Sequence, residues 1–348
     1  MGQPTARQDS STGSARFFRL ALATVLLCLG VPCRSARARS MEGGARPAPP
    51  NPLAESEKAL MQGRADDAIA KLRGLVAANP QDGRVHLLLC RAFYAEELGD
   101  DAVPECEAAL GTLSNDSKAQ DWMGRAYGLK ADQSGPIAGY KLATKVKAAF
   151  EAAVQLDPNN GDAVNDLSEY YVAAPSFVGG GVDKAVALAS KVEAQLPQEA
   201  HRIRALAAEK RHDYDTAERE FKAAVGQGGH SDAWTDLGHF YFRRDMKPQA
   251  VDALNHAVEA DRAHGPALVD IASILKDMHL ETDLAAQALR DYLASNAKTD
   301  AAPAFKAYVI WGHLLESAGD KQGARLQFQH ALALARDYPP AKRAIQHL

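Results

Sequence analysis

The chain has 348 residues, a formal net charge of −4, 46% hydrophobic residues and 7% aromatic residues. Alanine is the main apolar residue, and it is the strongest helix former. Beyond residue 38 the chain carries 35 basic and 43 acidic residues, which excludes the basic footprint of a general nucleic-acid-binding protein.

The N-terminus has the three parts of an export signal. Arg16 and Arg19 precede the 12-residue apolar run Leu20–Val31, and the small residues Ala36 and Ala38 follow it. This order is typical of a secretory signal. We therefore expect residues 1–38 to be a signal peptide and the protein to be exported, into the periplasm or out of the cell. An uncleaved membrane anchor stays open, although a membrane span needs about 20 apolar residues.

Residues 39–52 are rich in glycine and proline, which predicts a flexible linker. From Leu53 to the C-terminus no further long apolar run occurs. The remaining chain is instead organised by a repeated pattern, and repeats of this length are typical of stacked helical architectures.

The pattern is clearest between Trp234 and Ala257. Trp234, Leu237 and Tyr241 are spaced as one stripe of a first helix, and Gly238 leaves room for a second helix to approach. Ala250 and Ala257 are the small residues of that second helix. The same offsets recur along the chain, with one marker of each further repeat at Ala68, Ala102, Phe150, Ala185, Ala217, Ala285 and Ala324.

These spacings match the marker residues of the tetratricopeptide repeat (TPR), and the chain resembles TPR proteins from Leu53 to its C-terminus. The resemblance implies an all-α fold, a right-handed superhelical solenoid of about eight helix-turn-helix repeats over residues 53–338. Tyr338-Pro339-Pro340 should end the last repeat, and residues 339–348 should form a capping helix that covers the end of the array.

Two repeats are longer than the others between their helices. The third repeat is extended by about ten residues around 131–141, and the fourth by about five at 174–181. Together with the segments YGLKA and LATKVKAAFEAAVQLDPNN, these insertions resemble a subgroup of exported bacterial TPR proteins. Insertions of this kind map to one face of a solenoid and often carry function.

The sequence contains no recognisable catalytic constellation. Gly179–Gly181 are not followed by the Lys-Ser/Thr pair of a phosphate-binding loop, and they predict a turn. The eleven histidines show no metal-ligand spacing. We therefore expect that the protein is not an enzyme and that it has no catalytic residues, metal or cofactor. The remaining alternative is an enzyme whose catalytic residues lie in the two insertions.

The TPR resemblance implies a concave groove lined by the first helices, which binds a protein or peptide partner. The groove-facing positions of the first helices follow from their distance to the repeat markers. On this basis we expect the partner-binding groove to contain Arg91, Tyr94, Arg125, Asn165, Glu169, Arg204, Arg211, His239, Phe242 and Arg243. Because arginine pairs well with carboxylates, the partner would be carboxylate-rich. Simple solvation of an exposed face is the alternative.

Cys90 and Cys106 lie at positions where the two helices of the second repeat should face each other, equally far from the turn at residue 98. Export would place them in an oxidising compartment, so they are candidates for a disulfide. Two buried free thiols are the alternative.

The sequence leaves two non-enzymatic functions open. One is an interaction scaffold that binds a peptide or protein in the groove. The other is a structural subunit of a cell-envelope complex for secretion, polysaccharide export or outer-membrane assembly. No nucleic-acid partner is expected, and membrane contact would occur only through an uncleaved signal.

Overall fold

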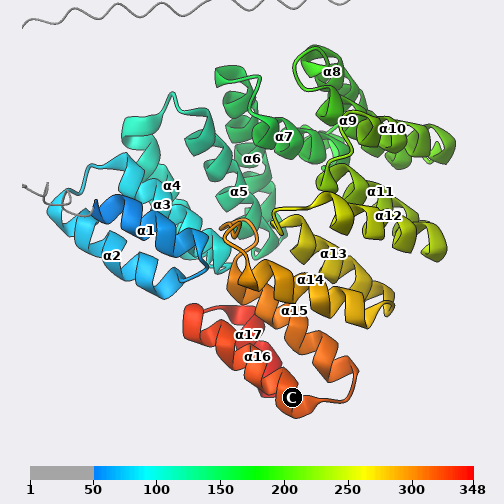
Figure 1. Cartoon of the computed structure of the whole chain (residues 1–348). Coiled ribbons are helices and arrows are strands. Elements are labelled where there is room, and N and C mark those ends of the chain that lie inside the picture. The colour runs from blue at the N-terminus through cyan, green and yellow to red at the C-terminus, as the bar shows by residue number, and fades with distance from the viewer. Residues whose placement is uncertain (1–50) are drawn as a thin grey trace, which may run out of the picture. The chain divides into compact units, whose positions relative to one another are not determined.

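The computed structural model describes residues 51–348, so the expected signal peptide and almost all of the expected linker lie outside the described residues. The described part consists of 17 α-helices and one 3₁₀-helix and contains no strand (Figure 1). The predicted all-α class is confirmed. Pro52, which was expected to end the linker, is instead the first residue of helix α1, with Asn51 as its N-cap.

The helices form eight consecutive antiparallel pairs. The first helices of the pairs are α1 (Pro52–Met61), α3 (Gly83–Ala95), α5 (Ser117–Asp132), α7 (Gly161–Ala173), α9 (Pro197–Lys210), α11 (Ser231–Arg243), α13 (Ala267–Met278) and α15 (Ala304–Ser317). The second helices are α2 (Ala65–Ala78), α4 (Gly99–Leu113), α6 (Pro136–Leu156), α8 (Val182–Val192), α10 (Tyr214–Gly226), α12 (Lys247–Ala260), α14 (Thr282–Ala294) and α16 (Lys321–Leu334). The 3₁₀-helix η1 (Ser176–Val178) precedes α8, and α17 (Pro339–His347) follows the last pair.

A glycine of the first helix lets the two helices of a repeat pack closely. A Cβ atom on Gly238 would lie 2.8 Å from Leu254 Cδ2, because the leucine side chain fills the space above the glycine. Phe328 fills the same space above Gly312. Both contacts join residues 16 positions apart. Only glycine permits this approach, since even an alanine would displace the facing side chain.

Cys90 and Cys106 occupy the glycine and leucine positions of this contact in the second repeat. They are also 16 residues apart, on α3 and α4, and they form a disulfide with a Cα–Cα distance of 5.1 Å. Both residues are buried. The covalent bond therefore lies where the sixth and eighth repeats use close apolar packing.

The last repeat returns to the first two repeats. Phe305, Phe328 and Tyr338 share one apolar cluster with Ala65 and Ala95. The association of the two ends therefore buries side chains in the same way as the stacking of neighbouring repeats.

A close backbone approach and a salt bridge accompany this cluster. Gly63, in the turn between α1 and α2, has φ +73° and lies against the backbone of Ala304, so a side chain there would clash. At the border of the cluster Arg336 pairs with Asp66 at 3.1 Å.

Glu96, at the end of α3, is buried beside this contact. Its side chain is 1% exposed, and its Oε1 atom has no hydrogen-bond partner among the described residues. Burial, reinforced by the nearby carboxylates of Asp66 and Asp337, raises the pKa of Glu96 to about 7. The contact between the two ends therefore favours the protonated form of this carboxyl group.

We predict that reduction of the Cys90–Cys106 bond destabilises the protein. The bond closes a loop of about 15 residues, for which the chain-entropy model gives about 3 kcal/mol. Urea unfolding with and without dithiothreitol measures the difference. The parent and a Cys28→Ala/Cys33→Ala control should both lose stability on reduction, whereas Cys90→Ala/Cys106→Ala should not respond. Equal responses of all three proteins would rule out this bond.

We predict that the pH dependence of stability changes in Glu96→Gln. The pKa of Glu96 is higher in the folded state than its ordinary 4.5, so the contribution of this group is fully present below pH 4.5 and is lost as the pH rises through 7. Between pH 5 and pH 8 the parent should lose about 2 kcal/mol more than the variant. Urea unfolding at both pH values checks this, with the exposed Glu259→Gln as the control. A parent-like pH response of Glu96→Gln would contradict the prediction.

Candidate partner-binding surface

The first helices present polar side chains at equivalent repeat positions. Asp162 on α7, Glu199 on α9 and Asp232 on α11 all lie in the first turn of their helix, three residues before Asn165, Arg202 and Thr235. They line a hollow of about 430 Å³. The charged residues of this hollow are Lys118, Asp157, Asp162, Glu199, Arg202, Asp232 and Asp236. Acidic side chains therefore outnumber basic ones here.

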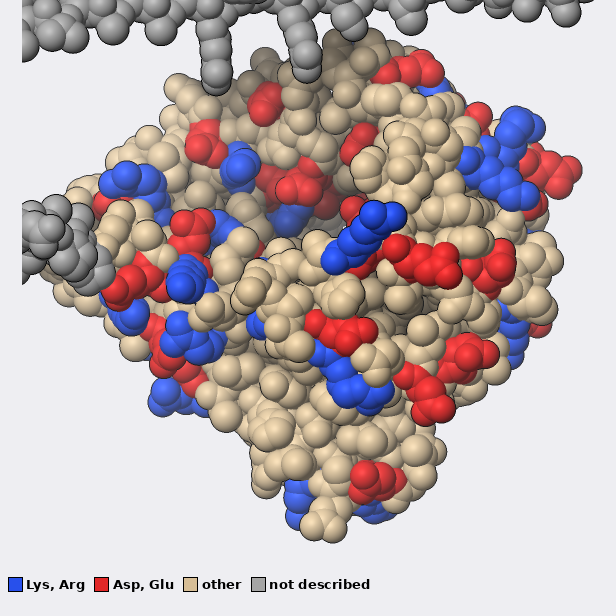
Figure 2. All heavy atoms as spheres, viewed as in Figure 1, with Lys and Arg blue, Asp and Glu red and all other residues tan. Residues whose placement is uncertain are grey.

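The arginines of this face are already paired within the chain. Arg202 of α9 donates to Glu169 of α7 at 2.6 Å and to Asp236 of α11 at 2.8 Å. Its salt bridges thus join three successive first helices. Figure 2 shows acidic and basic side chains together in a hollow of the face seen there.

Two further arginines are paired in the same way. Arg125 of α5 pairs with Asp121 of its own helix and with Asp166 of α7. Arg243 of α11 pairs with Glu209 of α9 at 2.7 Å. Together with Arg202, these residues form what we call the first-helix ion pairs, which connect α5, α7, α9 and α11.

Burial and crowding shift the protonation of several acids on this face. Burial raises the pKa of Asp121, against the opposite effect of Arg125. Burial also raises the pKa of Asp232, and the carboxylates of Asp236, Asp270 and Asp261 add to the increase. The environment of Asp232 is therefore negative, and a cation placed there would relieve the repulsion.

A loop of the chain itself contacts the first-helix face at repeats two and three. Asp300, between α14 and α15, is 5% exposed and accepts a hydrogen bond from Arg91 of α3 at 2.7 Å. The guanidinium of Arg91 also lies over Trp122, 5.4 Å from the ring centroid. A second hollow, of about 530 Å³, is lined by Ala301 together with Tyr94, Arg125, Asp166 and Glu169 of the first helices. The carboxylate next to Arg91 is therefore supplied by the chain itself.

The expected aromatic part of the groove lies on α11. His239 and Phe242 stack with their ring centroids 6.2 Å apart. Burial lowers the pKa of His239, and the neighbouring charge of Arg243 lowers it further. The neutral form of His239 is therefore favoured, and in that form the residue presents a flat, uncharged ring.

Eight of the ten expected groove residues lie on this face, but Arg204 and Arg211 do not. Arg204 donates to Glu193, directly after α8, at 2.9 Å, and Arg211 pairs with Asp183 of α8. Both side chains therefore point toward the preceding second helix. The prediction that these two side chains lie on the first-helix face is wrong, because the register of the fifth repeat is two residues earlier than the predicted one.

The correct register was available in the sequence. Thr235 lies 15 residues before the marker Ala250, and Arg202 lies 15 residues before the corresponding marker Ala217. Counting back from the second helix would have selected Arg202. The acidic row of Asp162, Glu199 and Asp232 was missed for a different reason, because acids in a first turn are also expected from the helix dipole.

No helix among residues 51–348 is long and apolar enough to cross a membrane. Within the same residues, no group of three or more histidine, cysteine or acidic side chains is arranged to hold a metal ion.

Asn165 and Glu169 also participate in contacts with Arg202, at 3.5 Å and 2.6 Å. The arrangement can therefore offer charge and hydrogen bonds to a partner, with most of its cations already neutralised.

Comparisons with known proteins agree with the repeat architecture. Two models described as tetratricopeptide repeat match residues 59–126 and 204–264. No curated protein sequence matches the chain significantly.

Several solved structures have similar folds. Yeast Tom70 is 16% identical, with a TM-score of 0.50, and the match covers 84% of this chain and 63% of Tom70. A thermophilic TPR protein of Thermus thermophilus is 17% identical over 65% of this chain and 97% of its own, with a TM-score of 0.44. A TPR protein of Parabacteroides merdae is 12% identical over 85% of this chain and 96% of its own, with a TM-score of 0.43. The chain therefore contains tetratricopeptide repeats at residues 59–126 and 204–264, and its eight helix pairs have the architecture of a TPR solenoid.

Proposed function

We propose that this TPR protein is an exported, non-enzymatic interaction scaffold that binds a segment of a partner protein on the face formed by its first helices. TPR proteins act in general as protein-binding scaffolds, which supports the class of function. The N-terminal signal pattern and the Cys90–Cys106 disulfide support export, because disulfides persist in oxidising compartments.

We propose further that the bound segment is cationic rather than carboxylate-rich. The arginines on this face are engaged with carboxylates of the chain, so they have little capacity left for an acidic partner. The observation that carries this proposal is the hollow of about 430 Å³ between α7, α9 and α11, where Asp162, Glu199 and Asp232 lie at the same repeat position. None of these three carboxylates forms a salt bridge within residues 51–348.

The geometry suits an extended segment. Successive first helices present their acids one repeat apart, so a partner would run across the helices and meet one carboxylate on each. The hollow also exposes the amides of Asn159 and Asn165 beside these acids. Amide groups can hydrogen-bond to a peptide backbone whatever its sequence, while the carboxylates select for lysine or arginine side chains.

The test is a binding measurement on a charge-neutralised triple variant, Asp162→Asn/Glu199→Gln/Asp232→Asn. The probe is a fluorescein-labelled, extended peptide with lysine at every third residue, and its glutamate counterpart serves as the second probe. Each lost pair should cost about 0.5 kcal/mol, which together is roughly a tenfold loss of affinity for the lysine peptide. The remaining affinity should depend less on salt than that of the parent.

Acids in the first turns of second helices provide a matched control. Asp101→Asn/Asp215→Asn/Asp283→Asn removes three charges at equivalent helix positions on α4, α10 and α14. This control should keep the parent's affinity while losing the same helix-dipole interactions. If the control and the groove variant weaken binding equally, or if the parent prefers the glutamate peptide, the proposed cationic partner is wrong.

A further inference from the structure

The two insertions of the third and fourth repeats meet on one surface. The third insertion lengthens α6 to 21 residues, and the fourth forms the loop 174–181 that contains η1. The hydroxyl of Tyr170 lies 2.8 Å from the carbonyl oxygens of both Ala143 in α6 and Val178 in η1. Gly180 has room for no side chain because it lies against the backbone of Ala174, so the loop is tightly closed. The insertions thus form one ordered unit.

This unit carries most of the exposed large apolar side chains. Among the described residues, three of the five that are exposed belong to it: Ile137 and Tyr140 on α6, and Phe177 in η1. Ile137 is 80% exposed and Phe177 is 72% exposed, and the rings of Tyr140 and Phe177 stack with centroids 6.1 Å apart. An ordered pair of aromatic rings that is exposed to water is typical of a surface that binds another molecule.

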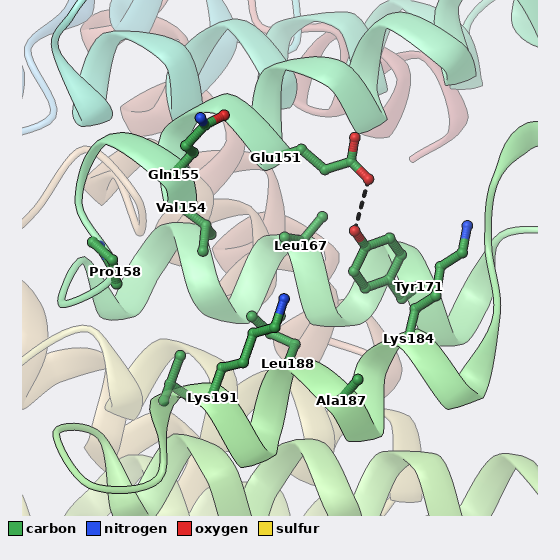
Figure 3. A pocket seen from close by; sticks show the side chains of 11 residues that line it. Glu151, Val154, Gln155, Pro158, Leu167, Tyr171, Lys184, Ala187, Leu188 and Lys191 are labelled. Carbon is green, nitrogen blue, oxygen red and sulfur yellow. Dashed lines mark hydrogen bonds between the residues drawn. The ribbon is translucent and has the colours of Figure 1, made fainter.

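A groove lies between α6 and α8. It has a volume of about 550 Å³, with Val154 of α6, Leu167 of α7 and Leu188 of α8 among its lining residues (Figure 3). The 174–181 loop separates α7 from α8, and α8 packs more extensively on α9 than on α7. The space that α8 would otherwise fill remains open beside α6.

The groove and the exposed aromatic pair share one stripe of α6. Ile137, Tyr140, Lys147, Glu151 and Val154 follow one another at helical spacings of three, four or seven residues. Glu151 is not free, because it accepts a hydrogen bond from the hydroxyl of Tyr171 at 2.8 Å (Figure 3). The stripe is therefore apolar toward its two ends, and its charged middle, Lys147 and Glu151, is paired internally at 3.9 Å.

Lysines border this surface, although residues 51–348 are acidic overall, with 33 basic and 42 acidic side chains. Lys184 and Lys191 project from α8 beside the groove, seven residues apart on the same side of the helix. Lys141 lies one turn after Ile137. None of the three forms a salt bridge with a described residue, unlike the arginines of the first-helix face, and Lys184 donates only to the carbonyl oxygen of Gly179, at 2.7 Å.

We propose that the α6–η1–α8 surface is a second docking site, which binds an amphipathic helix of a partner protein with an apolar stripe flanked by acidic residues. The apolar stripe would lie in the α6–α8 groove and against Tyr140 and Phe177, as in helix-in-groove recognition. Glutamates seven residues apart in the partner would match Lys184 and Lys191, which are about 10 Å apart along α8. This site is formed mainly by the second helices α6 and α8 with η1, and the residues proposed for it differ from those of the proposed first-helix site.

The test uses an 18-residue fluorescein-labelled peptide with a leucine stripe and glutamates seven residues apart, and a counterpart with lysines in place of the glutamates. Fluorescence anisotropy with the full chain should show at least roughly tenfold preference for the glutamate peptide, which corresponds to about two ion pairs on a partly desolvated surface. Lys191→Glu should remove the preference, and Phe177→Ser should weaken both peptides. Lys247→Glu and Leu326→Ser, an exposed lysine and leucine elsewhere, should match the parent.

Three outcomes would overturn the proposal. One is equal binding of both peptides by the parent, and another is an unchanged preference in Lys191→Glu when circular dichroism shows a folded protein. The third is that Phe177→Ser leaves peptide binding unaffected but changes another property of the protein. It would then abolish cosedimentation with phosphatidylglycerol vesicles, or dissociate a dimer that is detected by sedimentation equilibrium. The surface would then bind a lipid membrane or a second copy of this chain.

Discussion

The close approach of two helices within each repeat is the contact on which the rest of the structure depends. Gly238 under Leu254 and Gly312 under Phe328 show the same arrangement, with 16 residues between the partners. The contact fixes the distance and rotation of the paired helices, and thereby the surface that each pair presents to the next. In the second repeat the Cys90–Cys106 disulfide makes this contact covalent.

Stacking of the repeats brings charged side chains of neighbouring first helices within bonding distance. Partly buried charges require partners, and Arg125, Arg202 and Arg243 each find one on an adjacent helix. The ion pairs stabilise the alignment of the helices, and they also neutralise the arginines that a partner would otherwise meet. What remains available on this face is an excess of carboxylates around Asp232.

The insertions change the array without breaking its repeat contacts. Phe150 lies against Gly124 as Phe328 lies against Gly312, although the intervening segment is ten residues longer. The added length extends α6 beyond the packed core, and the 174–181 loop covers part of this extension. The apolar residues of the extension thus lie outside the repeat core, so their exposure costs the array no internal packing.

The sequence by itself determined the helical class, the eight repeats, the insertions and the facing positions of the two cysteines, because helix pairing is local and each repeat presents its markers at short, regular spacings. It also placed Arg91, Arg125 and Arg243 on the first-helix face. Tertiary structure decided what those arginines contact, since Asp300 reaches Arg91 across 209 residues and Asp166 reaches Arg125 from the next repeat. It also decided the contact between the first and last repeats and the buried state of Glu96, because periodicity describes each repeat and its neighbours but carries no information on distant repeats that the curvature of the array brings together.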